Sequence, residues 1–289
     1  MTRKILIGLL LLTPLGMRGE ALRIGNLDLS DYRLAWSEEF DGDSLDRSVW
    51  NVEDNGSGCG NHELQHYIDS PEVVAVADGK LRLTARRDSC SCGGHEFVSA
   101  RLNTLGKFNF QYGVVQASIR CPRTADGLWP AFWMMGDDIS QSGWPHCGET
   151  DVLEMGHADG IAEGVQDRLF NGALHWGRHA GEHFSEVGSM RSLSSLQDGE
   201  FHTFTVVWTP ESISMYVDDI SQPYFTHDIA EDGRVTSASQ FFHKPNFLLL
   251  NLAVGGDFPD IHTADAVTAL ADGPRSMEVD YIRIYQKNQ

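Results

Sequence analysis

The amino-acid sequence predicts an all-β protein whose two antiparallel sheets pack as a sandwich. Apolar and polar residues alternate with a period of two in many segments, and this alternation is typical of strands with one buried face. No segment of comparable length shows the 3.6-residue period of an amphipathic helix. Many short strands between turns rich in Gly, Pro and Asp favour two sheets folded as one domain.

Five segments carry the strand prediction in chain order. Residues 80–86 and 107–112 alternate strictly, so each is predicted as a half-buried strand. Residues 204–208 and 213–217 alternate on either side of a Thr-Pro-Glu turn and predict a hairpin, with the tryptophan that ends the first strand assigned to the core. Residues 247–254 are apolar on both faces and end at two glycines, which predicts a strand buried on both sides.

The chain is strongly acidic. Its 289 residues include 22 Lys and Arg against 41 Asp and Glu, so the formal charge is −19. No cluster of basic residues is present, which excludes nucleic acid and anionic membrane surfaces as partners. Hydrophobic residues make up 41% of the chain, enough for one large core. Because no linker or internal repeat divides it, residues 22–289 are predicted as a single domain, and we expect a monomer.

Residues 1–21 are predicted as a signal peptide. Arg3 and Lys4 precede the apolar run 5–12, which is followed by a Thr-Pro break and small residues. The run is far shorter than the roughly 20 apolar residues that a membrane-spanning helix requires. We therefore expect an exported protein, secreted or periplasmic, with no membrane span.

Five cysteines in an exported chain indicate disulfides, and the odd number leaves at least one thiol outside any pair within the chain. Cys90 and Cys92 are too close in sequence for a mutual bridge. If both are oxidised, they require different partners among Cys59, Cys121 and Cys147, and the connectivity stays open.

Three carboxylates lie within the six residues from Glu149 to Glu154, in an otherwise apolar strand. Burying like charges together costs free energy, so their presence indicates a use for them. On a regular strand Glu149 and Asp151 share a face and Glu154 points to the other. A β-bulge at Val152 and Leu153 would place all three acids on one face.

A row of acids on one face suits glycosidic cleavage, in which one carboxylate is the nucleophile and a protonated one is the general acid. A third acid between them raises the pKa of a neighbour and separates the two roles. The alternative is an exposed acidic edge or a cation site. Trp129, Trp133, Trp144 and Trp176 lie near the acids in sequence and favour a saccharide site, because indole rings stack on sugars; core packing is the alternative for each ring.

Several motifs in the expected order resemble glycoside hydrolase family 16. The segment from Glu149 to Glu154 is similar to the E-x-D-x-x-E signature of its bulged, laminarinase-like branch; the lichenase and xyloglucan-transferase branches have one residue fewer. The resemblance extends over nearly the whole chain beyond the signal peptide. The other matching motifs are residues 36–42, 61–67, 99–101, 129–136, 251–256 and 279–285.

This resemblance implies a concanavalin-like β-jelly-roll sandwich with a concave substrate cleft, and a secreted, retaining endo-β-glycosidase. It implies Glu149 as nucleophile, Asp151 as assisting carboxylate and Glu154 as general acid/base. The positions that match sugar-subsite residues of the family are Glu63, Arg101, Trp129, Trp133, Trp144, His175 and Asn251.

The resemblance implies no required cofactor. Many relatives bind a structural calcium, and the matching positions here are the carboxylate of Asp280 and backbone oxygens near Gly79. A solvent-facing role is the alternative for Asp280.

For substrate the resemblance implies β-1,3-glucan or mixed-linkage β-1,3-1,4-glucan. Departures in the loops keep a second substrate open: the usual Asn-Trp-Pro-Gly is replaced by 257–260, Asp-Phe-Pro-Asp, and 88–94 resembles a Cys-bearing insertion. The alternative is an endo-β-1,4-galactosidase acting on poly-N-acetyllactosamine, keratan or mucin O-glycans. A non-catalytic lectin is the alternative from another class, and the intact acid row counts against it. The acidic charge disfavours heavily sulfated polymers.

Overall fold

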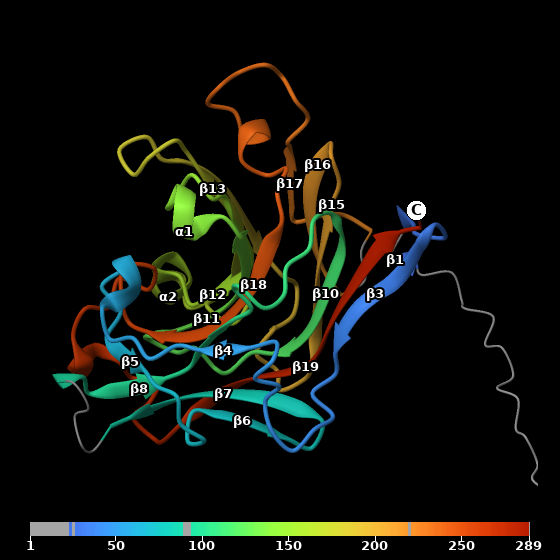
Figure 1. Ribbon diagram of the computed structural model, residues 1–289. Helices are drawn as coiled ribbons and strands as arrows, with labels where there is room; N and C mark the ends of the chain where they lie inside the picture. The colour runs from blue at the N-terminus through green and yellow to red at the C-terminus, as the bar shows by residue number, and fades with distance from the viewer. Residues whose placement is uncertain (1–22, 25–26, 89–93, 219–220, 289) are drawn as a thin grey trace, which may run out of the picture.

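The computed structural model describes residues 23–24, 27–88, 94–218 and 221–288 and shows two large β-sheets packed against each other (Figure 1). The predicted signal peptide lies outside the described residues, as do Cys90 and Cys92. Across the described ranges, no helix is long and apolar enough to cross a membrane. The α-helices, α1 (Ile139–Ser142) and α2 (Ala158–Glu163), are short, which confirms the all-β prediction.

The first sheet has ten strands, and its pairs are antiparallel except for one parallel pair near the end of the sheet. The strands are β3 (Tyr32–Glu38), β5 (Gln65–Tyr67), β6 (Val74–Ala77), β7 (Lys80–Arg87), β8 (Phe97–Ser99), β10 (Gly113–Arg120), β15 (His202–Trp208), β16 (Ser212–Val217), β17 (Phe225–Asp228) and β19 (Arg275–Lys287). They run in the order β17-β16-β15-β10-β19-β7-β8-β5, with β3 beside β19 and β6 beside β7. The parallel pair is β5 with β8.

The second sheet has seven antiparallel strands and carries the acid row. The strands are β4 (Asn51–Val52), β9 (Arg101–Asn103), β11 (Leu128–Gly136), β12 (Glu149–Met155), β13 (Leu169–Trp176), β14 (Phe184–Arg191) and β18 (Asn246–Val254). They run in the order β14-β13-β12-β11-β18-β9-β4. The short elements are the pair β1 (Arg23–Ile24) and β2 (Leu27–Asp28), and the 3-10 helices η1 (Gly58–Gly60), η3 (Ala238–Gln240) and η4 (Ala264–Ala266).

The main core lies between the two sheets. Alternate residues of β7 are buried there, and β15 and β16 form the predicted hairpin, in which Trp208 pairs with Ile213. Trp208 is buried in the core, as predicted. All nine residues of β18 are buried, because one face packs into this core while Phe247 and Leu249, on the other, join a second apolar cluster.

The strand predicted over 107–112 is wrong. The only pairing in this segment is an isolated bridge between Phe110 and Asn246, and the chain turns at Tyr112, where φ is 57°. The alternation reports burial here: Phe108 stacks on Trp36 with ring centroids 4.3 Å apart, and Phe110 lies in the core. Apolar side chains can therefore anchor a loop at the period of a strand without a neighbouring strand to pair with.

Candidate active site

β12 contains the predicted bulge. Along its border with β11, Asp151 and Leu153 pair with successive residues, so Val152 is an extra residue between them. Val152 and Leu153 are consecutive, and both are fully buried in the core. The extra residue returns Glu154 to the face that carries Glu149 and Asp151. The sequence-based prediction of a bulge at this place is confirmed.

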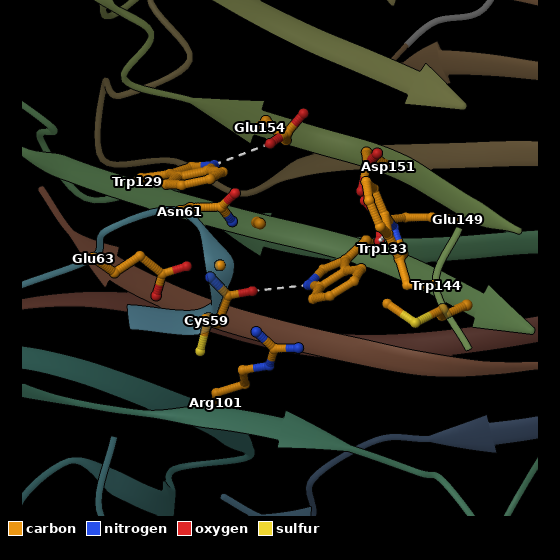
Figure 2. A pocket seen from close by; sticks show the side chains of 14 residues that line it. Cys59, Asn61, Glu63, Arg101, Trp129, Trp133, Trp144, Glu149, Asp151 and Glu154 are labelled. Carbon is orange, nitrogen blue, oxygen red and sulfur yellow. Dashed lines mark hydrogen bonds between the residues drawn. The ribbon is translucent and has the colours of Figure 1, made fainter. Parts of the chain in front are cut away.

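The three acids line one pocket of about 310 Å³ on the outer face of the second sheet (Figure 2). Cys59 and Gly60 of η1, and Asn61 and Glu63 just after it, also line the pocket. Six of the seven predicted subsite residues also line this pocket, and they are Glu63, Arg101, Trp129, Trp133, Trp144 and Asn251. The fold therefore brings residues from β9, β11, β12, β18 and two loops to one place.

Glu149 begins β12 and is half-buried. The Nε1 atom of Trp144 donates a hydrogen bond of 3.1 Å to Glu149 Oε2. Burial raises the pKa of Glu149 to about 7, while the positive charge of Arg101 and the hydrogen bond from Trp144 act in the opposite direction. This carboxyl group is therefore poised to lose its proton near neutral pH.

Glu154 is half-buried at the other end of the acid row. Trp129 reaches it from β11 and donates a hydrogen bond of 3.1 Å from Nε1 to Oε1 (Figure 2). Burial and the negative charge of Glu149 raise the pKa of Glu154 to about 8, against the effect of this hydrogen bond. Glu154 can therefore hold a proton at neutral pH.

Asp151 lies between the two glutamates and is only 5% exposed. Its Oδ2 atom is buried without a hydrogen-bond partner among the described residues, and His175 Nε2 lies 3.4 Å from it. Burial and the charges of Glu149 and Glu154 raise the pKa of Asp151 well above its usual range. Protonation of one acid in this row thus depends on the state of the others.

His175 is the one predicted subsite residue that does not line the pocket. It lies on β13, opposite Glu149 in the strand register. Its Nδ1 atom is 2.9 Å from Nε2 of His183, the residue just before β14. Burial and His183 lower the pKa of His175 to about 4, so its ring is neutral at neutral pH. Its contact with Asp151 places it behind the acid row.

A hydrogen-bond network fixes the part of the pocket beside the acids. Trp133 Nε1 donates to Asn251 Oδ1 at 2.8 Å, and Asn251 Nδ2 donates to the hydroxyl of Tyr67 at 3.4 Å. Tyr67 in turn donates to Glu63 Oε2 at 2.8 Å, and Gln65 donates to the same oxygen at 2.6 Å. All five side chains are buried or nearly so, and this network orients the Trp133 ring and the Glu63 carboxylate.

Arg101 supplies positive charge on the β9 side of the pocket. Its guanidinium group lies 4.8 Å from the centre of the Trp133 ring, which is a cation–π distance. Its Nε atom donates to Glu53 Oε1 at 3.1 Å. These two contacts hold Arg101 where its charge also acts on Glu149.

Comparisons with known proteins decide the family. The model of "Glycosyl hydrolases family 16" matches residues 61–267. The chain belongs to this family. A glucan endo-1,3-beta-glucosidase of Cryptopygus antarcticus is 35% identical over 264 residues, which cover 88% of this chain and 92% of that protein. Glucan endo-1,3-beta-glucosidase A1 of Niallia circulans is 33% identical over 90% of this chain, and the match spans 38% of that longer protein.

Comparison with solved structures also supports this family. A Bacteroides ovatus mixed linkage glucan GH16 protein, in complex with a G4G4G3G product, is 36% identical. The likeness covers 86% of this chain and 99% of that one, with a TM-score of 0.76. The β-jelly-roll sandwich and the assignment as a glycosidase are therefore confirmed.

Sequence reasoning missed several residues of the site in this family 16 glycosidase. Phe258 stacks on Trp129 with ring centroids 4.6 Å apart and an interplanar angle of 11°. Asn61 lay in a recognised motif without a role, whereas Phe258 lay in 257–260, the segment that departs from the family pattern. No sequence pattern indicated Cys59, because η1 brings it to the pocket and this turn was not predicted. Burial raises the pKa of its thiol to about 11.

The positions predicted for calcium in this family 16 glycosidase lie in the first sheet. Gly79 forms the β6–β7 turn with φ of 68°, and Asp280 follows Val279, which pairs with Leu81 of β7. A Cβ atom added to Gly79 would lie 3.9 Å from Oδ1 of Asp41. Carboxylate and backbone oxygens are the ligands that calcium prefers, so Asp280, Asp41 and the backbone near Gly79 are the groups that would hold it.

The described cysteines of this glycosidase are free thiols: Cys59, Cys121 and Cys147. Cys121 and Cys147 are buried, and burial raises the pKa of each to about 12. Both are therefore neutral thiols packed as small apolar groups.

Proposed function

We propose that this family 16 glycosidase is an exported, retaining endo-β-glycosidase that cleaves β-1,3-glucan or mixed-linkage β-1,3-1,4-glucan. The observation that carries the proposal is the acid row itself: the bulge of β12 places Glu149, Asp151 and Glu154 on one face of the sheet, where they line one pocket. Burial raises the pKa of both terminal glutamates, to about 7 for Glu149 and about 8 for Glu154, so each can hold or lose a proton near neutral pH. Separate protonation of two facing acids is what a double-displacement mechanism requires.

In the first step Glu149 attacks the anomeric carbon as a carboxylate, while protonated Glu154 donates its proton to the leaving oxygen. The indole of Trp129 donates a hydrogen bond to the Glu154 carboxyl group, and that of Trp144 donates one to Glu149. Both acids are therefore held in a fixed orientation before the substrate binds. The product of this step is a covalent glycosyl-enzyme on Glu149.

In the second step Glu154, now a carboxylate, takes a proton from the water that attacks the glycosyl-enzyme. Asp151 supports both steps, because its protonation state depends on the charge of both glutamates. When Glu149 becomes an uncharged ester, its repulsion of Glu154 disappears. This lowers the pKa of Glu154 and suits its change from acid to base.

The substrate part of the proposal rests on the relatives. Two of the proteins named above are glucan endo-1,3-beta-glucosidases, and the Bacteroides ovatus structure holds a mixed linkage glucan product. The pocket suits a neutral sugar chain, because Trp129, Trp133 and Trp144 offer ring faces while Glu63 and Asn251 offer hydrogen-bonding groups.

A second substrate is favoured by one observation. Phe258 stands where the family usually has Trp, and its ring covers Trp129 beside the general acid. A keratan-sulfate endo-1,4-beta-galactosidase of Sphingobacterium multivorum is 29% identical over 89% of this chain. Keratan or poly-N-acetyllactosamine is therefore the alternative substrate class.

Product analysis tests the proposal. Purified protein is incubated with laminarin, barley β-glucan and desulfated keratan, and the product sizes and the anomeric configuration of fresh ends are followed by chromatography and proton NMR. We expect a ladder of oligosaccharides with β-anomeric ends from one of the glucans. A ladder from keratan alone would transfer the assignment to the galactosidase class. Binding to every polymer without any cleavage would instead support the lectin hypothesis.

The export part of the proposal rests on residues 1–21, which lie outside the described residues. Arg3, Lys4 and the apolar run that follows them have the composition of a signal peptide. Expression in a bacterial host followed by N-terminal sequencing of periplasmic material tests it. Retention of Met1 on protein found only in the cytoplasm would contradict export.

A further inference from the structure

We propose that Asp151, His175 and Glu149 form a binding site for a divalent transition-metal cation, with Zn²⁺ as the representative ion, and that this ion competes with the sugar substrate. The site goes beyond the hydrolytic function proposed above. Only the inhibition that follows from it rests on that function.

The three side chains already have the separations of a metal site. One ligand atom of each lies within 4.8 Å of the others, and Asp151 Oδ2 is 3.4 Å from His175 Nε2. Two ligands bound to tetrahedral zinc at about 2.1 Å are about 3.4 Å apart. Asp151 and His175 therefore stand at ligand separation, and only the Glu149 side chain has to adjust.

The hydrogen bonding around the site also favours a cation. Asp151 Oδ2 is buried and has no hydrogen-bond partner in the described part of the chain. His175 Nδ1 lies 2.9 Å from His183 Nε2. In the tautomer with the hydrogen on Nδ1, His175 donates to His183 and the lone pair of its Nε2 is available to a cation. A cation between Asp151 Oδ2 and His175 Nε2 would then bind both atoms. Metal-bound histidines are usually held through their other ring nitrogen in this way.

Charge and access also favour a cation. Glu149, Asp151 and Glu154 bring three carboxyl groups to one pocket wall, and Arg101 is the one cationic side chain among its lining residues. Two carboxylates and one imidazole match the mixed oxygen and nitrogen ligand sets of zinc, in which water can take the fourth position. An ion held there would occupy the carboxylate that attacks the sugar.

A second cluster of similar composition supplies the matched control. His62 Nδ1 lies 3.0 Å from Asp257, and His262 Nε2 lies 3.9 Å from the same aspartate. His62 is exposed and is not one of the residues that line the pocket. Substitution of His62 therefore removes an exposed imidazole beside a carboxylate without touching the proposed ligands.

Calorimetric titration with ZnCl₂ tests the proposal on the full-length protein, with a separate circular dichroism check that each variant is folded. We expect one Zn²⁺ site in the wild type, at least about tenfold weaker binding in H175Q, and unchanged binding in H62Q. The variant E154Q retains all three ligands and should bind Zn²⁺. Added glucan oligosaccharide should displace the ion from it.

Equal Zn²⁺ affinity in the wild type and H175Q would overturn the proposal, as would loss of binding in H62Q alone. Calorimetry does not depend on turnover, so the two proposals fail separately. An active glucanase that binds no Zn²⁺ would refute the metal site, whereas Zn²⁺ binding by a protein that cleaves no glycan would refute the hydrolytic function. In an active enzyme we expect Zn²⁺ to raise the KM for glucan, with kcat unchanged, and H175Q to lose this effect.

Discussion

The indole nitrogen of Trp144 donates a 3.1 Å hydrogen bond to Glu149. Trp129 makes the same kind of bond to Glu154, so each terminal acid of the row has its own indole donor. These bonds stabilise the charged form of each carboxyl group and oppose the effect of burial on its pKa. The two tryptophans therefore limit the rise in pKa that burial causes at the two glutamates, and both line the pocket.

Replacing Trp144 by Phe should move the acidic limb of the pH profile of kcat/KM to higher pH. The hydrogen bond from Trp144 lowers the pKa of Glu149, so its loss raises that pKa above about 7, and the nucleophile is protonated over a wider range. One hydrogen bond corresponds to a shift of about half to one pH unit. W129F should instead move the basic limb upward, because Glu154 must keep its proton. A shift of the same limb in both variants would contradict the assigned roles.

Replacing Glu149 by Gln should reduce hydrolysis by at least about a thousandfold while the protein stays folded, because the nucleophile is lost. In the smaller variant E149A, added azide should restore cleavage and give a glycosyl azide of inverted configuration, which NMR identifies. Comparable thermal unfolding of wild type and variant is the control for folding. Wild-type turnover by E149Q would refute the mechanism.

Deletion of Val152 tests the bulge. Without the extra residue, either Glu154 turns into the core or Leu153 turns out of it, and burying an unpaired carboxyl group or exposing a leucine costs about 2 kcal/mol or more. We expect loss of activity together with a lower midpoint of urea unfolding. The substitution V152A keeps the register and is the control: it should lose stability but retain most of its activity.

The hydroxyl of Tyr67 supports the pocket network. Y67F removes the donor to Glu63 and the acceptor for Asn251, both in buried surroundings, so we expect a loss of about 1–3 kcal/mol in the free energy of unfolding. Y32F is the matched control, because the Tyr32 hydroxyl has no hydrogen bond to any described residue. Equal unfolding free energies for Y67F and Y32F would show that the network contributes nothing to stability.

Calcium removal tests the residues around Gly79. If Asp280 and Asp41 hold calcium, dialysis against EGTA should lower the Tm by several degrees, and added CaCl₂ should restore it. Without any treatment, D280N should already have the lower Tm that EGTA produces in the wild type. Neither EGTA nor CaCl₂ should change the Tm of this variant. A Tm of the wild type that is independent of calcium would remove this site from consideration.

The sequence predicted the acid row and its bulge because a strand has a strict period of two. An acid out of phase, such as Glu154, demands one extra residue. Spacing along one strand could not predict how Trp129, Phe258 and His183 would surround the acids, since those residues come from other strands and loops. That arrangement depends on sheet order and twist, which no local pattern encodes.

The error at 107–112 has a related cause. Alternation reports which side chains are buried, and Phe108 and Phe110 are anchored in or against the core. It does not report whether a second strand lies alongside. Only the positive φ at Tyr112 and the absence of a continuous partner exclude a strand, and both are properties of the folded chain.

The position of β19 has a consequence for the time at which the protein can fold. β19 pairs with β3, β7 and β10, and it is the only sheet partner of β3 among the described residues (Figure 1). A nascent chain that has not yet delivered residues 275–287 leaves three strands with open edges. Folding of the first sheet therefore finishes only after residues 275–287 have been synthesised. Until then the chain is incompletely folded, and it can still pass through a translocation channel as an extended polypeptide.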